Sequence, residues 1–366
     1  MKFTCNTKAL ASAVAGVSRA VTATSAVPVL QGILIRAEGF KLELTGYDLE
    51  MAITTTLEAN VTEPGEIVLP AKLLGEMVRS LPAEELTVSS EESLSTRITG
   101  GITEFDILGM SAADFPDLPA PGADHAFEID AAELAGMLGM TLYAVSTDDK
   151  KPAHTGALFS IEPGEVTIVA LDGFRLAITK HPVITDREIS IVVPAKTAAE
   201  VSRLMGDAGE NIRVDANKRY VVFSGGNYTV MSRLIEGEFL NYKTVLPEGF
   251  KTRVVVDVPA FEAAIERCSV IITERLKNPL RVSFGEVIDI RCQTPLGRVS
   301  DQLPAEIEGD HVEIGFNYRY LLDALRNAGC DRVVLELSGP LSPAKILPAE
   351  GDDFLFLVLP VRFKND

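Results

Sequence analysis

The chain repeats one sequence landmark three times, and this repetition constrains its fold more than any other feature. The landmark is a segment of alternating apolar residues that leads into a helix-like segment. Its copies are MKFTCNTKALASAVAGVSRAV from Met1, HAFEIDAAELAGMLGMTLYAV from His125 and TRVVVDVPAFEAAIERCSVII from Thr252. A cleavable leader would occur once, at the N-terminus. The apolar stretch at residues 9–17 is therefore predicted to be a helix of the fold rather than a signal peptide.

A second landmark, a strand leading into a helix, follows each copy of the first. Its copies are GEIVLPAKLLGEMVRSLP, REISIVVPAKTAAEVSRLMGD and DHVEIGFNYRYLLDALRNAG. Lys72, Lys196 and Arg319 occupy the same position in them, 124 and then 123 residues apart. A strand-rich tail completes each third, with alternating apolar residues between Gly, Asn and Asp turns. The pattern predicts an α+β chain of three pseudo-repeated domains, each with about two helices and roughly eight short antiparallel strands.

Clusters of Pro and Gly at residues 119–122 and 247–249 are typical of linkers. They place the three domains at residues 1–121, 122–249 and 250–366. Symmetric arrays of similar units close into rings or extend into filaments, depending on the interface between units. A ring is the hypothesis that this chain favours.

The distribution of charge matters more than its total. With 34 Lys and Arg against 52 Asp and Glu, the net charge of −18 alone argues against a nucleic-acid partner. The second helix of each repeat, however, carries charges at i, i+4 and i+7, on one helical face. For any single helix, an ordinary face of salt bridges explains this spacing. These residues are Lys72, Glu76 and Arg79; Lys196, Glu200 and Arg203; and Arg319, Asp323 and Arg326.

Over the six predicted helices we count nine basic and six acidic residues, a net of +3 that leaves −21 for the rest of the chain. Helices that face a common centre would give an acidic protein a mildly basic lining. Such a lining suits sequence-independent contact with the phosphates of a duplex, which the outer surface would repel.

No sequence motif points to catalysis. P-loop, HExxH, GxSxG and dinucleotide glycine patterns do not occur, and His125, His154, His181 and His311 are far apart. The alternative to a non-catalytic protein is a phosphoryl-transfer enzyme, in which paired carboxylates such as Asp148-Asp149 and Asp352-Asp353 would hold Mg²⁺. Both pairs lie in polar stretches, however, and this context favours solvated loops. We expect no metal and no cofactor.

The remaining composition argues for a reducing compartment. The four cysteines have no metal-ligand or CxxC spacing and are expected to be free thiols: Cys5, Cys268, Cys292 and Cys330. No apolar run is long enough to span a bilayer, so a cytoplasmic location is expected.

Ten motifs, in order and at matching spacing from Met1 to Phe363, resemble the bacterial sliding clamps, the beta subunits of DNA polymerase III. They are MKFTCNTKAL, VPVLQGILI, LTGYDLEMAI, LPAKLLGEMVRSLP, AADFPDLP, ALDGFRLAI, IVVPAKT, SRLIEGEFLNYKTVLP, EIGFNYRYLLDAL and FLVLPVRF. The resemblance implies a homodimeric ring of six similar domains, with helices lining the hole and antiparallel sheets outside. Such a ring encircles double-stranded DNA and acts in DNA replication as a non-catalytic processivity factor of the polymerase III holoenzyme, with a clamp loader and repair proteins as further partners. The alternative is a ring-forming scaffold that does not encircle DNA.

The resemblance also assigns residues to DNA and to the dimer interface. The basic residues expected to face DNA are Lys8, Arg19, Lys72, Arg79, Lys150, Lys151, Lys196, Arg203, Arg319 and Arg326. Thr24 stands where the family frequently has a DNA-contacting Arg. The dimer would pair Ile271 and Ile272 of one chain with Ile107 and Leu108 of the other.

A peptide-docking cleft between the second and third domains is the third assignment. The apolar C-terminal segment FLFLVLPVRF supports it, because it holds more apolar residues than one buried strand face needs and Pro360 interrupts its strand pairing near the terminus. His154 and Leu240 depart from the residues common in the family. The expected cleft residues are His154, Leu171, Gly173, Phe174, Arg175, Leu176, Leu240, Val245, Leu341, Pro343, Leu357, Leu359, Pro360, Val361 and Arg362.

Overall fold

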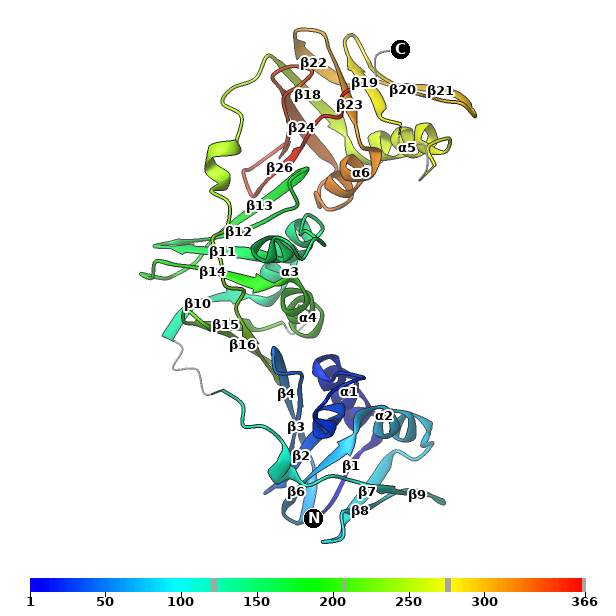
Figure 1. Cartoon of the computed structure of the whole chain (residues 1–366), viewed down its shortest axis with the longest axis vertical. Helices are drawn as coiled ribbons and strands as arrows, with labels where there is room; N and C mark the ends of the chain where they lie inside the picture. Colours follow the sequence, from blue (N-terminus) through cyan, green and yellow to red (C-terminus); the bar gives the residue numbers. More distant parts are fainter. Residues whose placement is uncertain (120–123, 207–208, 274–277, 364–366) are drawn as a thin grey trace. The chain divides into compact units, whose positions relative to one another are not determined.

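The computed structural model describes residues 1–119, 124–206, 209–273 and 278–363. The chain divides into two compact units, Met1–Ala135 with Ala199–Leu234 and Gly136–Ala198 with Ile235–Asp366. Along the described chain, two α-helices and a set of antiparallel strands recur in the same order in each third (Figure 1). The predicted α+β fold of three pseudo-repeats is confirmed; the exact domain boundaries stay a prediction.

The first unit is built from two antiparallel sheets. The sheet orders are β5-β1-β7-β8-β9 and β10-β15-β16-β17-β4-β3-β2-β6, so β17 of the second repeat pairs with β4 of the first. The strands are β1 (Lys2–Asn6), β2 (Gly32–Glu38), β3 (Lys41–Tyr47), β4 (Met51–Glu58), β5 (Asn60–Glu63), β6 (Gly65–Pro70), β7 (Glu85–Ser90), β8 (Ser95–Gly100), β9 (Thr103–Leu108), β10 (Asp124–Asp130), β15 (Asn211–Ala216), β16 (Tyr220–Gly225) and β17 (Tyr228–Arg233).

The second unit repeats this plan. Its sheet orders are β14-β11-β12-β13-β26-β25-β24-β18-β22 and β21-β20-β19-β23. The strands are β11 (Gly156–Glu162), β12 (Glu165–Leu171), β13 (Arg175–Pro182), β14 (Ile189–Pro194), β18 (Thr252–Asp257), β19 (Leu280–Phe284), β20 (Ile288–Thr294), β21 (Gly297–Leu303), β22 (Glu306–Gly309), β23 (Val312–Phe316), β24 (Arg332–Leu337), β25 (Ala344–Pro348) and β26 (Phe354–Val358).

The helices begin where a strand ends, as both landmarks predict. They are α1 (Thr7–Val17), α2 (Ala71–Ser80), α3 (Ala131–Leu142), α4 (Ala195–Met205), α5 (Val258–Ser269) and α6 (Tyr318–Arg326). Short 3₁₀ turns are η1 (Ser18–Ala20), η2 (Pro28–Gln31), η3 (Ala112–Asp114), η4 (Pro152–Thr155) and η5 (Tyr242–Val245). The residue before α1, α5 and α6 caps its first turn, because the side chains of Asn6, Asp257 and Asn317 accept backbone N–H bonds there.

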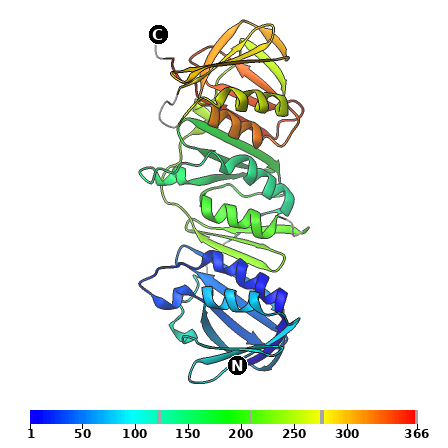
Figure 2. The ribbon, with the colours of Figure 1, turned by 90° about the vertical axis from the view of Figure 1, so that its right-hand side faces the viewer.

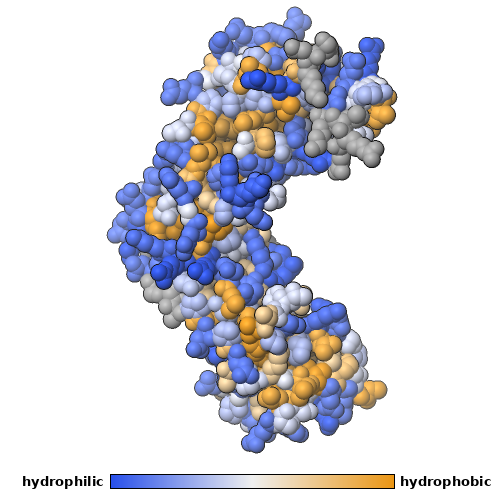
Figure 3. Space-filling model, viewed as in Figure 1, coloured by the Kyte–Doolittle hydropathy of each residue, from blue (hydrophilic) through white to orange (hydrophobic). Residues whose placement is uncertain are grey.

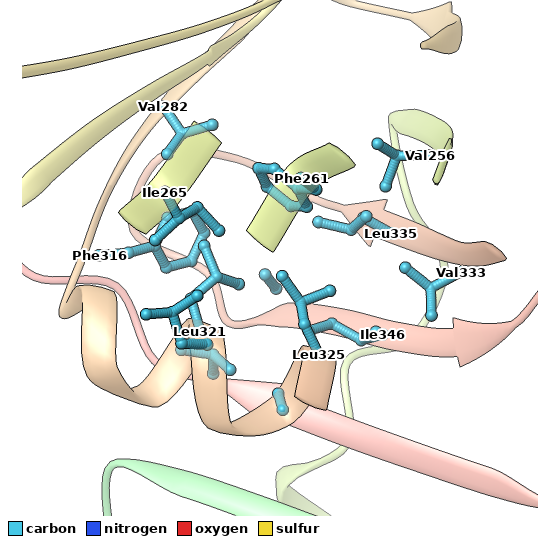
Figure 4. Close-up of a cluster of buried hydrophobic side chains, with 14 of the residues drawn as sticks. Val256, Phe261, Ile265, Val282, Phe316, Leu321, Leu325, Val333, Leu335 and Ile346 are labelled. Atoms are coloured by element: carbon cyan, nitrogen blue, oxygen red, sulfur yellow. The ribbon is translucent and has the colours of Figure 1, made fainter. Parts of the chain in front are cut away.

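Within each unit, paired helices pack on the sheets. Figures 1 and 2 show α1 beside α2 in the first unit and α5 beside α6 in the second. The core of the second unit places Phe261 and Ile265 of α5 and Leu321 and Leu325 of α6 among strand residues such as Leu335 (Figure 4). All five are essentially buried, and this burial of apolar surface holds the helices on the sheet. As expected, the four cysteines are free thiols.

Candidate partner-binding surface and basic helix face

The second and third repeats join edge to edge in one sheet. Strand β13 pairs antiparallel with β26, with Leu176 opposite Leu357 and Arg175 opposite Val358. One face of this pairing, which we call the β13–β26 junction, carries an apolar cluster. Its buried members are Leu158, Val169, Leu171, Leu176, Ile178, Val192, Tyr242 and Leu357.

Around this buried floor lie apolar side chains that water reaches. Figure 3 shows the apolar surface, in orange, gathering where β13 and β26 meet. Leu171, Leu176 and Leu357, predicted as cleft residues, belong to the floor and are at most 3% exposed. Five other predicted cleft residues are exposed by 37 to 65%: Phe174, Leu240, Val245, Leu341 and Val361.

The chain end extends the junction along its edge. The backbone N–H of Leu359 donates to the carbonyl of Phe174 at 2.9 Å, and that of Val361 donates to Gly315 at 2.7 Å. Leu359, Pro360 and Pro343 are half-buried, whereas Arg362 is exposed. Strand β26 ends before Pro360, as the sequence indicated.

Val361 and Arg362 also border a second feature, which the sequence did not predict. A hollow of about 1420 Å³ lies beside the four-stranded sheet of the second unit. Its lining includes Arg281, whose guanidinium lies 4.1 Å from the centre of the Phe363 ring, and it excludes the buried floor of the junction. Val361 and Arg362 therefore also line this hollow, whereas Leu171, Leu176 and Leu357 do not.

The loop before β13 is organised by an aspartate. The Oδ1 atom of Asp172 accepts the backbone N–H of Phe174 at 2.8 Å and that of Arg175 at 3.0 Å. Gly173, between Asp172 and Phe174, has φ of 92°, a left-handed conformation that suits glycine. The turn directs Phe174 outward, 59% exposed, and Leu176 inward, 3% exposed.

Arg175 is held by the protein itself. Its side chain is 13% exposed, its Nε atom lies 3.0 Å from Asp172 Oδ2, and its Nη1 atom donates to Asp323 Oδ2 of α6. Its guanidinium also lies over the rings of Tyr320 and Tyr143, 4.7 and 5.4 Å from their centres. Arg175 was predicted in the cleft, whereas Asp172, Tyr143 and Tyr320 were not, and Asp323 was assigned to a charged helix face.

His154 lies at the edge of the same unit. Its ring packs edge-on against Phe239, with ring centres 5.6 Å apart. Burial, with a smaller contribution from Lys151, lowers the pKa of His154 below its ordinary value. The neutral form of the side chain is thus favoured, and its ring contributes aromatic surface.

The ten basic residues predicted to face DNA are all exposed. Two ion pairs do not follow the i,i+4 spacing: Arg203 pairs with Glu200, three residues earlier, at 2.7 Å, and Arg326 pairs with Glu266 of the neighbouring helix α5 at 2.5 Å. Arg19 lies 3.8 Å from Glu200. The ion pairs leave the basic groups at the surface, where a polyanion can reach them.

The predicted dimer residues lie on one edge strand, β9, and in the segment that follows α5. Strand β9 is the last strand of its sheet, and it carries Ile107, 8% exposed, and Leu108, 70% exposed. Strand β21 is the end strand of the four-stranded sheet. Ile271 and Ile272 are partly buried against the core of the second unit.

Family models for the N-terminal, central and C-terminal domains of the DNA polymerase III beta subunit match residues 1–119, 128–241 and 243–362. The chain belongs to the DNA polymerase III beta subunit family, the bacterial sliding clamps. The beta sliding clamps of Staphylococcus aureus and Staphylococcus epidermidis are both 30% identical to it, and each match covers 94% of both chains.

Solved sliding clamps have the same fold. The Bacillus subtilis clamp is 30% identical, with a TM-score of 0.96 over the whole of both chains. A Pseudomonas aeruginosa clamp, solved bound to griselimycin, is 28% identical, with a TM-score of 0.95 over 99% of this chain and 100% of the other. These matches confirm the resemblance that the ten motifs indicated.

Two further observations concern the alternatives. In the described part of this sliding clamp, no group of three or more His, Cys, Asp and Glu residues is placed to hold a metal ion. Asp352 bonds to Lys180 Nζ, and Asp148 accepts the backbone N–H of Lys150 in a turn. Among the described helices, none is long and apolar enough to cross a membrane.

Proposed function

We propose that two copies of this sliding clamp close into a ring around double-stranded DNA and tether the replicative polymerase without catalysing a reaction, in the cytoplasm. The observation that carries this proposal is the sign of the helical charge: α1 to α6 with η1 hold nine basic and six acidic residues in a chain of net charge −18. A ring that holds DNA by topology needs only weak, non-specific phosphate contacts at its inner face, and these permit sliding.

Retention on circular DNA tests the proposal. The protein is loaded by a bacterial clamp loader onto a nicked circle, the free protein is removed, and the circle is then cut once. We expect the protein to stay on the circle and to leave the linear product. Equal retention on both forms would exclude encirclement and favour a scaffold.

We further propose that the β13–β26 junction binds an extended peptide from the polymerase or other partners. A buried floor with an exposed apolar rim suits side chains of Leu or Phe type, which gain by leaving water. The Pseudomonas aeruginosa relative solved with griselimycin supports a ligand site in the family. Half-buried Leu359, Pro360 and Pro343 and exposed Leu240 and Val245 would complete the surface.

Leu359 provides the test of this surface. Leu359→Asp should abolish binding of a fluorescent peptide derived from the polymerase, because it places a carboxylate on the apolar rim, while sedimentation still shows a dimer. Phe40→Asp, at an 84% exposed position in the turn between β2 and β3, is the matched control. Unchanged affinity in the Leu359 variant would mean that the peptide binds elsewhere.

The dimer is proposed to form between the edge strands β9 and β21. Both strands end their sheets, and an unpaired strand edge presents backbone N–H and C=O groups that another chain can satisfy. Two equivalent contacts of this kind, related by a twofold axis, would close a ring. Exposed Leu108 on β9 would supply apolar contact beside the backbone pairing.

A further inference from the structure

Arg175 sits between two carboxylates that come from different repeats. Asp172 belongs to the turn before β13, whereas Asp323 lies on α6 of the third repeat. The side chains of Arg175 and Asp172 are each 13% exposed and are therefore largely shielded from water, whereas that of Asp323 is 37% exposed. Removing one partner from a shielded charge cluster is costly, because the other charges lose compensation.

The guanidinium also contacts the first of two stacked aromatic rings. It lies 4.7 Å from the centre of the Tyr320 ring, within the range of a cation–π contact. Tyr320 in turn stacks on Phe174, with ring centres 6.0 Å apart and planes at 20°. Phe174 is an exposed rim residue of the β13–β26 junction, so the rim is connected to Asp323 through Arg175 and Tyr320.

Two nitrogens of the Arg175 guanidinium are engaged within the protein. Nε bonds to Asp172 at 3.0 Å, and Nη1 bonds to Asp323. Asp172 uses its other oxygen to hold the turn that carries Phe174. A guanidinium that contacts two carboxylates and two rings is suited to hold these groups in place beside the rim.

We propose that Asp323 is a positioning residue for partner binding: from α6 it holds Arg175, and Arg175 fixes the Phe174–Tyr320 stack at the rim of the junction. This inference rests on the proposed peptide-binding function. It separates Asp323 from its helix neighbours Arg319 and Arg326, which are expected to face DNA, and gives it a role toward the peptide.

A single tryptophan tests the position of the rim. The chain has no Trp, so Phe174→Trp introduces the only indole. Adding Asp323→Asn should shift its emission to the red and increase quenching by acrylamide, because the ring stack loosens. Asp352→Asn is the matched control. It weakens the ion pair with Lys180, which lies on β13 as Arg175 does, but it leaves the contacts of Arg175 untouched.

Peptide affinity tests the consequence. Asp323→Asn should weaken binding of the fluorescent polymerase-derived peptide by about tenfold, the value of roughly one charge-assisted hydrogen bond. In an Arg175→Met background, Asp323→Asn should add little, because the two residues act in series. Arg175→Lys, which keeps the charge but loses the planar fork, serves as a second background if the Met variant unfolds.

The outcomes separate this inference from the proposed function. If the wild-type protein does not bind the peptide, or Leu359→Asp binds it normally, the proposed surface is wrong and the inference fails with it. If Leu359→Asp abolishes binding but Asp323→Asn changes neither emission nor affinity, the positioning role alone is overturned. Changed emission with unchanged affinity, or additive effects in the double variant, would also overturn it.

Discussion

At the residue scale, the repeated turns before β4 and β13 show how one backbone is built from different sequences. Asp48 accepts the N–H groups of Glu50 and Met51, as Asp172 does for Phe174 and Arg175. The residue after the aspartate has positive φ in both turns, but it is Gly in the second repeat and Leu49, with φ of 75°, in the first. A left-handed leucine carries a steric cost that glycine avoids.

Leu49→Asn should therefore stabilise the protein by about 0.5–1 kcal/mol, since Asn adopts the left-handed conformation more readily and Leu49 is already half exposed. Urea unfolding followed by circular dichroism measures the change. Leu73→Asn, at a comparably exposed position inside α2, should instead destabilise by roughly 0.3–0.7 kcal/mol through helix propensity. A lower free energy of unfolding in the Leu49 variant would show that the left-handed conformation of Leu49 does not strain the backbone.

His154 should make stability depend on pH in the acidic range. Its pKa is lowered in the folded state, so below about pH 6.5 the unfolded chain binds more protons. Its contribution is fully present above that pH and is lost as pH falls through the folded pKa. The difference in urea midpoint between the wild type and His154→Gln should be constant from pH 7 to 8. As the pH is lowered toward 5.5, the midpoint of the wild type should fall relative to that of the variant. A constant difference throughout would contradict the lowered pKa.

At the element scale, the sequence predicted the helices and their order but not the strand pairing. Helices α2, α4 and α6 follow directly from the landmarks at Lys72, Lys196 and Arg319, because helix periodicity and strand alternation are local signals. The β13–β26 and β17–β4 pairings join strands that are far apart in the chain. The sequence of one strand does not indicate which distant strand it pairs with. The contact between Asp323 and Arg175 depends on that pairing and was missed with it.

The edge strand β9 gives a test of assembly. Leu108→Asp should convert the dimer into monomers in sedimentation velocity, because it replaces an exposed apolar contact, worth about 1.5–3 kcal/mol when buried, with a charge at both interfaces of the ring. Ile102→Asp, in the fully exposed turn between β8 and β9, is the control and should remain dimeric. If both variants behave alike, β9 is not the interface.

At the scale of the whole molecule, the net charge of −18 first argued against DNA, and its division between helices and sheets reverses that argument. Net charge governs how the protein behaves at distances beyond the Debye length, whereas DNA inside a ring would lie within a few ångströms of the helices. The ten motifs identified the family correctly because they are spread over the whole chain. The positions of individual DNA contacts remain predictions, since side-chain exposure alone does not select among the ten basic residues.

Reversing charge on the helix face should separate electrostatic contact from topological retention. The triple variant Lys72→Glu, Lys196→Glu, Arg319→Glu should bind short linear duplexes more weakly, and the slope of log K against log salt should fall by about 0.9 for each phosphate that the protein no longer neutralises. Its retention on a closed circle after loading should be unchanged, because retention there is topological. The control is a second triple variant of the same net charge, whose reversals lie at exposed positions outside the six helices: Lys41→Glu, Lys218→Glu, Lys251→Glu. Equal weakening in both variants would show that total charge, and not the helix face, governs DNA contact.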